Sequence, residues 1–149
     1  MNELKASLQI ALANTFVMYF KAHSFHWNVE GIHFTQYHSF FNSLYDDLYS
    51  AVDPLAEELR GLDTYAPTSL NDLYGKATLT ENSILVGDNV RQMLNSLLTD
   101  NEEVIDSLNK VFELANKENE QGICNLVADR LDTHKKHGWQ LRASLKGQQ

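Results

Sequence analysis

The sequence predicts an all-α protein: four long helices packed as a bundle, with a short helix in the long middle connection. Val and Ile are scarce while Leu, Ala, Asn, Asp and Glu are abundant, which disfavours β-strands. Two prolines and seven glycines in 149 residues leave little to interrupt long elements. Apolar residues recur at three- and four-residue steps, the spacing of amphipathic helices. We expect residues 1–149 to form a single domain.

The first two helices are expected over residues 2–30 and 33–62, joined as a hairpin. Gly31 is expected to end the first helix, as C-terminal glycines do. The core face of the second helix repeats every seven residues through Phe34, Phe41, Leu48, Leu55 and Leu62. Pro54 requires either a kink or a restart with Asp53 as N-cap. We prefer a kink, because the heptad repeat continues in phase across the proline.

The second half of the chain begins with a long connection over residues 63–87, interrupted by a proline and two glycines. A connection of this length can cross from one end of a bundle to the other. The helix that follows could instead begin at Thr99, which has capping-box spacing with Glu102. A short helix within the connection and two further long helices are expected over residues 69–74, 88–116 and 119–145.

The composition also limits the choice of partners. A formal net charge of −8 disfavours nucleic acid and anionic membrane. The basic cluster of Arg130, Lys135, Lys136 and Arg142 is interpreted as a solvated helix face. A single cysteine, Cys124, cannot form an internal disulfide, which fits a reducing compartment. With neither a signal-peptide pattern nor an apolar run of membrane-spanning length, we expect a cytoplasmic protein without a membrane partner.

His26 and His38 are the first candidates for a chemical site. If the first two helices form a hairpin about Gly31, both histidines lie a few turns from the bend and can face each other. Neutral imidazole nitrogens bind iron, zinc, copper or nickel. A histidine on an apolar face is commonly a hydrogen-bonded core residue instead, and for this pair both interpretations stay open.

Asn42, Asp46, Asp53 and Glu57 share one flank of the second helix. Asp53 and Glu57, four residues apart, could bind a metal together; the alternative is an N-cap and a solvated glutamate. On a straight helix Asp53 lies about 22 Å from His38, so one copy cannot unite them. A second copy packed antiparallel can, which predicts two identical sites across a two-fold contact. Exposed aromatic residues of the same helix would supply apolar area for this contact: Phe40, Tyr45 and Tyr49.

The chain contains the run His26-Trp27-Asn28-Val29-Glu30-Gly31, followed by Phe34, His38, Phe41, Asp53 and Ala56-Glu57. This pattern resembles the signature of the Dps family, the miniferritins or DNA-binding proteins from starved cells. Trp139, within His137-Gly138-Trp139, is similar to the tryptophan of that family's last helix. The resemblance covers nearly the whole chain and implies a ferritin-like four-helix bundle that assembles into a hollow homododecamer.

The resemblance also implies a ferroxidase, which oxidises Fe(II), typically with hydrogen peroxide, stores ferric mineral and so limits oxidative damage. His26 and His38 would bind iron from one subunit, and Asp53 and Glu57 from its neighbour, with Glu57 reaching toward a second, weaker iron position. Four residues after the second histidine the family usually has a carboxylate, and here stands Asn42. A neutral amide oxygen is a weaker ligand, which leaves open whether one or two irons bind.

Two neighbours of these residues have open roles. Asp46, one turn beyond Asn42, could compensate for the missing carboxylate. Trp27, beside His26, is either an oxidisable neighbour or a core residue, and we expect a core residue.

The family's pore aspartate falls on Asn125. Glu118, Glu120 and Asp129 are candidates to line a pore through which iron enters; the alternative is a solvated helix face.

Three functions remain open: a ferroxidase and iron store, a nucleoid-binding cage, and a structural metal-binding bundle in which Asn42 abolishes diiron oxidation. Dps proteins that bind DNA generally use a lysine-rich tail. Here Lys5 is the lone early base, and the chain ends in Lys146-Gly-Gln-Gln. Direct DNA binding is therefore not expected.

Overall fold

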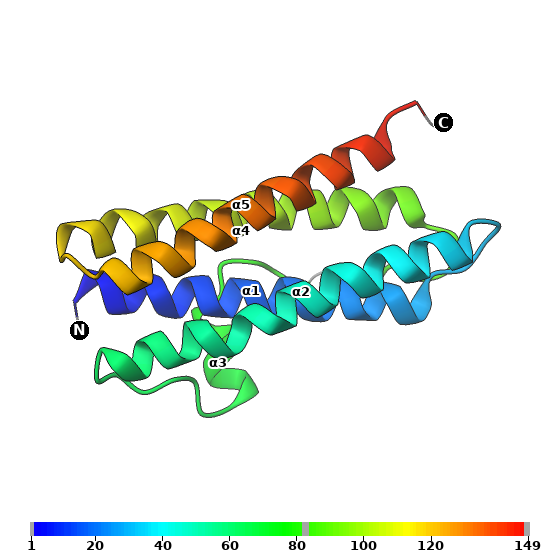
Figure 1. Ribbon diagram of the computed structural model, residues 1–149. Helices are drawn as coiled ribbons and strands as arrows, with labels where there is room; N and C mark the ends of the chain where they lie inside the picture. The colour runs from blue at the N-terminus through cyan, green and yellow to red at the C-terminus, as the bar shows by residue number, and fades with distance from the viewer. Residues whose placement is uncertain (1, 82–83, 148–149) are drawn as a thin grey trace.

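Two antiparallel helix hairpins pack against each other in this computed structural model, which describes residues 2–81 and 84–147 (Figure 1). The long helices are α1 (Glu3–Asn28), α2 (Phe34–Gly61), α4 (Val90–Lys117) and α5 (Gln121–Leu145). Because α2 ends at the opposite end of the bundle from the start of α4, the connection between them runs along the bundle (Figure 1). The all-α prediction and the crossover position of the middle connection are confirmed.

The short helix α3 (Leu70–Lys76) lies within this connection and contacts α1. Ser69 caps its N-terminus, since the Ser69 hydroxyl accepts a hydrogen bond from the Asp72 amide at 3.0 Å. The connection is fastened to α1 by Asn14, which is fully buried. Its side-chain oxygen accepts from the amide of Thr78 at 2.8 Å and from that of Leu79 at 3.2 Å.

The turn between α1 and α2 differs from the prediction, because Gly31 does not cap α1. The helix ends at Asn28, and Val29 is an extended C-cap. The reason is a short bridge to the middle connection. The Gly87 amide donates to the Asn28 carbonyl at 2.8 Å, and the Gly87 carbonyl accepts from the Glu30 amide. Gly31 lies in the turn itself, at φ +120, and a Cβ there would approach the Asp88 carboxylate to 2.7 Å.

The second helix continues through Pro54 without interruption. A restart with Asp53 as N-cap is therefore wrong, and so is the alternative start of α4 at Thr99, since α4 begins at Val90. The heptad positions Phe41, Leu48 and Leu55 of α2 are fully buried, whereas Phe34 at the start of the repeat is 40% exposed. Within the described ranges, no helix is both long and apolar enough to cross a bilayer.

A buried polar network joins α2 to α5 near the middle of the bundle. Arg130 donates to both carboxylate oxygens of Asp47, at 2.9 and 2.8 Å, and Nε2 of His137 donates to Asp47 at 2.6 Å. Although burial opposes ionisation, these hydrogen bonds and charges hold the pKa of Asp47 well below its usual value. The interpretation of Arg130 as part of a solvated face is wrong, because its side chain is 9% exposed.

The network extends to α4 through His134, which is fully buried. A guanidinium nitrogen of Arg130 donates to Nε2 of His134 at 3.1 Å, so the proton of the neutral ring lies on Nδ1. This Nδ1–H donates a hydrogen bond to the side-chain oxygen of Asn101 at 2.8 Å. Burial, together with the charges of Arg130 and His137, lowers the pKa of His134 well below its ordinary value. The ring therefore stays neutral at neutral pH.

Candidate metal centre

His26 near the end of α1 and His38 in the first turns of α2 face each other across the hairpin. Nδ1 of His26 lies 2.8 Å from the main-chain oxygen of His38, and Nδ1 of His38 lies 2.8 Å from the main-chain oxygen of His26. Their rings stack at 3.8 Å between centroids with an interplanar angle of 18°. The hairpin geometry expected from the sequence thus brings this pair together.

The reciprocal hydrogen bonds determine which nitrogen of each ring is free. A carbonyl oxygen only accepts, so Nδ1 must carry the proton in both His26 and His38. In the neutral rings the lone pair then lies on Nε2. A metal-binding histidine typically uses its other ring nitrogen in this way, to donate a hydrogen bond to a carbonyl or carboxylate oxygen. The pair consequently has the protonation pattern of two metal ligands.

His23, one turn before His26, forms part of the same site, although the sequence reasoning gave it no role. Its ring stacks on Tyr45 at 3.8 Å and lies 4.0 Å from the ring of Trp27. Burial and the nearby His26 lower the pKa of His23, with Asp46 acting in the opposite direction. The three-residue spacing of His23 and His26 on one helix was the signal that could have identified it.

Asn42 follows His38 by one turn of α2 and is half-buried. Its amide nitrogen lies 3.4 Å from a carboxylate oxygen of Asp46, one turn further along. This orientation leaves the amide oxygen of Asn42 free as a neutral ligand. Asp46 is exposed, and its suggested compensation for the missing carboxylate stays a prediction.

Asp53 and Glu57 are both exposed on α2, far from the histidines of the same protomer. Because α2 is one continuous helix, the fifteen residues from His38 to Asp53 correspond to about 22 Å. Among the residues that the structure describes, no three His, Cys, Asp or Glu side chains in one protomer come close enough together to hold a metal ion. A site that unites the histidines with these carboxylates therefore requires a second subunit.

Several aromatic residues differ in exposure from the sequence-based expectation. Phe40 and Tyr45 are half-buried against the core, and Tyr49 alone of the three expected surface rings is exposed, at 58%. Trp27 is 56% exposed, so within one protomer its interpretation as a core residue is wrong. Each candidate pore residue lies near the start of α5, exposed or half-buried, and the pore itself stays a prediction: Glu118, Glu120 and Asp129.

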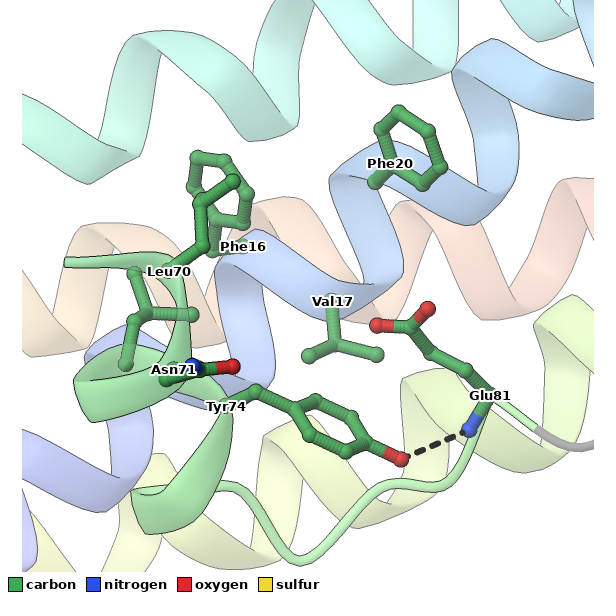
Figure 2. Close-up of a pocket in the computed structure, with 8 residues that line it drawn as sticks. Phe16, Val17, Phe20, Leu70, Asn71, Tyr74 and Glu81 are labelled. Carbon is green, nitrogen blue, oxygen red and sulfur yellow. Dashed lines mark hydrogen bonds between the residues drawn. The ribbon is translucent and has the colours of Figure 1, made fainter.

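An apolar cavity of about 480 Å³ opens between α1 and α3 (Figure 2). Phe16, Phe20 and Leu70 line it, and on its far side the Tyr74 hydroxyl accepts from the Glu81 amide at 3.1 Å. Phe20 is 46% exposed and Leu70 72%. A single protomer thus leaves a large apolar surface uncovered beside the helix that carries His26.

Comparison with known proteins agrees with this architecture. A family model of the ferritin-like domain matches residues 5–148. The crystal structure of Dps from Thermosynechococcus elongatus superposes with a TM-score of 0.92 at 27% identity, over 98% of this chain and 92% of that one. The Dps protein of Vibrio cholerae O1, described as a member of a broad superfamily of ferritin-like diiron-carboxylate proteins, gives 0.90 at 27% identity, over 97% and 89%.

A sequence relative points the same way. The DNA protection during starvation protein of Brevibacillus brevis is 29% identical over 139 residues, which span 91% of this chain and 89% of that protein. Four long helices, a short helix in the crossover and a match over nearly the whole length define a ferritin-like protein. The chain belongs to the Dps family within that class.

Proposed function

We propose that this protein is a ferroxidase and iron store: it oxidises Fe(II), with hydrogen peroxide as oxidant, at sites shared between two subunits. The observation that carries the proposal is the paired Nδ1 hydrogen bonding of His26 and His38. It leaves two Nε2 lone pairs as ready iron ligands, while Asp53 and Glu57 stand exposed further along α2. Each protomer therefore carries two complementary halves of a site.

The substrate iron would be held by His26 and His38 of one subunit and by Asp53 and Glu57 of its neighbour. Carboxylates are hard, charged ligands that stabilise Fe(III) relative to Fe(II), so binding favours loss of an electron. Asn42 adds only a neutral amide oxygen, which weakens the second iron position. The imidazoles orient the ion, and the acidic side chains balance its charge.

A second copy of the chain is the partner this arrangement needs. Packing two α2 helices antiparallel brings the histidine end of one to the carboxylate end of the other and creates two identical sites. The same contact would cover exposed apolar side chains of the protomer, among them Phe20, Tyr49 and Leu70. By family membership, six such dimers would close into a hollow cage of twelve subunits that holds ferric mineral in the cytoplasm.

Direct DNA binding is the second candidate, favoured by the name of the Brevibacillus brevis relative. The net charge of −8 opposes it, since phosphate contacts require clustered lysine and arginine. The final glutamines of the chain's end, Gln148 and Gln149, lie outside the described residues. We expect no gel shift of duplex DNA at moderate salt; a salt-sensitive shift would establish the nucleoid-binding alternative.

Subunit mixing tests the shared site. His38→Ala and Asp53→Ala are each expected to abolish the rise in ferric absorbance after addition of Fe(II) and peroxide. When the two variants are dissociated and assembled together, each mixed dimer regains one intact site, so random pairing restores about a quarter of the wild-type sites. Glu58→Ala, one residue from Glu57 on the same helix, is the matched control and should keep full activity. Absence of recovery in the mixture would overturn the proposal.

A further inference from the structure

A continuous chain of rings leads from the His26–His38 pair into α1. The Tyr19 hydroxyl lies 2.9 Å from Nδ1 of His23. The ring of His23 is 5.9 Å from that of His26 and stacks on Tyr45 at 3.8 Å, and Tyr45 in turn is 5.1 Å from His26. Two routes of short ring-to-ring steps therefore connect the half-buried phenol of Tyr19 to a candidate iron ligand.

From this geometry we infer that Tyr19 supplies an electron for the reduction of peroxide, while His23 receives the phenolic proton. The inference rests on the proposed function of the site. A phenol that loses an electron becomes strongly acidic, so its proton needs an acceptor already within hydrogen-bond distance. Nδ1 of His23 is such an acceptor, provided that the ring carries its proton on Nε2.

The need for a second electron follows from Asn42. Reduction of hydrogen peroxide to water takes two electrons, and a site that holds one Fe(II) supplies only one. Without a second donor, the O–O bond would break to hydroxide and a hydroxyl radical. A nearby phenol is a one-electron donor that can intercept this step at the protein.

The reaction balances with Tyr19 as that donor. Fe(II) and Tyr19 each give one electron, and hydrogen peroxide takes both together with two protons from solvent and leaves as two water molecules. The products on the protein side are Fe(III), a neutral tyrosyl radical at Tyr19 and a protonated His23. Burial, with Tyr49 and Tyr45 nearby, raises the pKa of Tyr19, so the phenol keeps its proton until it is oxidised.

Neighbouring rings can share the radical. Tyr49 lies 5.0 Å from Tyr19, so the radical can pass to a second phenol, on the face that the proposed subunit contact would cover. Trp27 lies 4.0 Å from His23 and is the competing donor. Ring packing without redox chemistry is the remaining alternative, and it predicts no radical at all.

The test is electron paramagnetic resonance on the assembled protein, frozen after one Fe(II) per site has reacted with peroxide. Wild-type protein is expected to show a tyrosyl signal that narrows when ring-deuterated tyrosine is incorporated. Tyr19→Phe should lose most of this signal and should release more hydroxyl radical to a spin trap, while ferric absorbance still develops. Tyr65→Phe, at a ring that is 78% exposed and stacks under Arg60, is the matched control and should behave as wild type.

A second variant tests the proton acceptor. His23→Phe keeps an aromatic ring against Tyr45 but removes the acceptor nitrogen, so the tyrosyl signal should fall although Tyr19 is present. Ferric product without a tyrosyl signal, a tryptophanyl signal in its place, or a signal unchanged in Tyr19→Phe would overturn this inference alone. Absence of ferric product in the wild type would instead remove the proposed function, and this inference with it.

Discussion

The imidazoles of His26 and His38 each donate a hydrogen bond from Nδ1 to the other residue's main-chain oxygen, at 2.8 Å in both directions. The α1–α2 hairpin thus holds both rings, and with them the proposed ligand nitrogens, in place through contacts within one protomer. Such pre-organisation lowers the ordering cost of binding iron. The acidic half of the proposed site, Asp53 and Glu57, is exposed in the protomer, so a subunit contact would have to position it.

The two hydrogen bonds between His26 and His38 predict a loss of stability, on mutation, that does not depend on iron. His38→Ala removes one hydrogen bond and the ring stacked on His26, so the free energy of unfolding of iron-free protein should fall by about 1 kcal/mol. Denaturant unfolding at fixed protomer concentration measures it. His33→Ala, at an exposed ring nearby, should change stability by less than about 0.5 kcal/mol. Equal effects of the two substitutions would contradict a structural role for the hydrogen bonds between His26 and His38.

Asn42 predicts the number of irons per site. In Asn42→Asp a charged carboxylate replaces the neutral amide oxygen beside the histidines, so the second iron position should fill at lower Fe(II) concentration. Anomalous scattering from crystals soaked in Fe(II), or anaerobic titration calorimetry, counts the ions. Ser43→Asp adds the same charge one residue away and should leave the count unchanged. A second iron already fully occupied in the wild type would refute the weakening role of Asn42.

The apolar surface between α1 and α3 predicts how strongly subunits associate. Leu70 is 72% exposed, and Leu70→Asp places a charge in the surface that the two-fold contact is expected to cover. Sedimentation should show smaller species at a given concentration, with a parallel loss of ferric absorbance because the shared sites come apart. Asn109→Asp adds the same charge at an exposed position of α4 and controls for net charge. An unchanged assembly would place the contact elsewhere.

The helices and the histidine pair could be predicted from sequence because both depend on local spacing. The heptad of α2 predicts its buried face, and a hairpin with histidines on either side of the bend brings His26 and His38 together. The prediction that Gly31 ends α1 was wrong because the end of α1 is set by a bridge to Gly87, far along the chain. No local pattern contains that contact.

The Asp47–Arg130 pair shows the same limit for buried charge. Arg130 is followed closely by two lysines, so its neighbours in sequence indicate a solvated face. Its actual partner lies 83 residues earlier, on another helix. The side chain is buried because α2 supplies a carboxylate at that level of the bundle, and one sequence without known contacts does not show this pairing.

Breaking this pair predicts a large loss of stability. Asp47→Asn leaves the buried Arg130 without its counter-charge and should lower the free energy of unfolding by about 3 kcal/mol, the lower end of values for buried pairs, since the Asp47 side chain is 28% exposed. The double variant Asp47→Leu with Arg130→Met removes both charges and should be more stable than the single variant. Denaturant midpoints compare the three proteins. A double variant less stable than Asp47→Asn would indicate that the charges themselves stabilise the fold.

His134 predicts how stability depends on pH. The fully buried ring meets Arg130 and His137 on its own helix, Asn101 on α4 and the charge of Asp47 on α2. Its pKa in the folded protein lies below the ordinary histidine value of 6.5, so below that pH the unfolded chain binds more protons than the folded one. The contribution of His134 is therefore fully present above pH 6.5 and decreases as pH falls toward the folded-state pKa, by up to about 1.4 kcal/mol per pH unit.

His134→Gln replaces the ring by a side chain that does not titrate, so stability between pH 6.5 and pH 5 should depend less steeply on pH than in the wild type. Thermal and urea unfolding across this range measure the two slopes. His33→Gln removes an exposed histidine and should keep the wild-type slope. Asp47, whose pKa is depressed from 3.8, contributes in a separate and more acidic window, because its stabilisation is lost only as pH falls below that value. A wild-type slope retained in His134→Gln would assign the acid sensitivity to other groups.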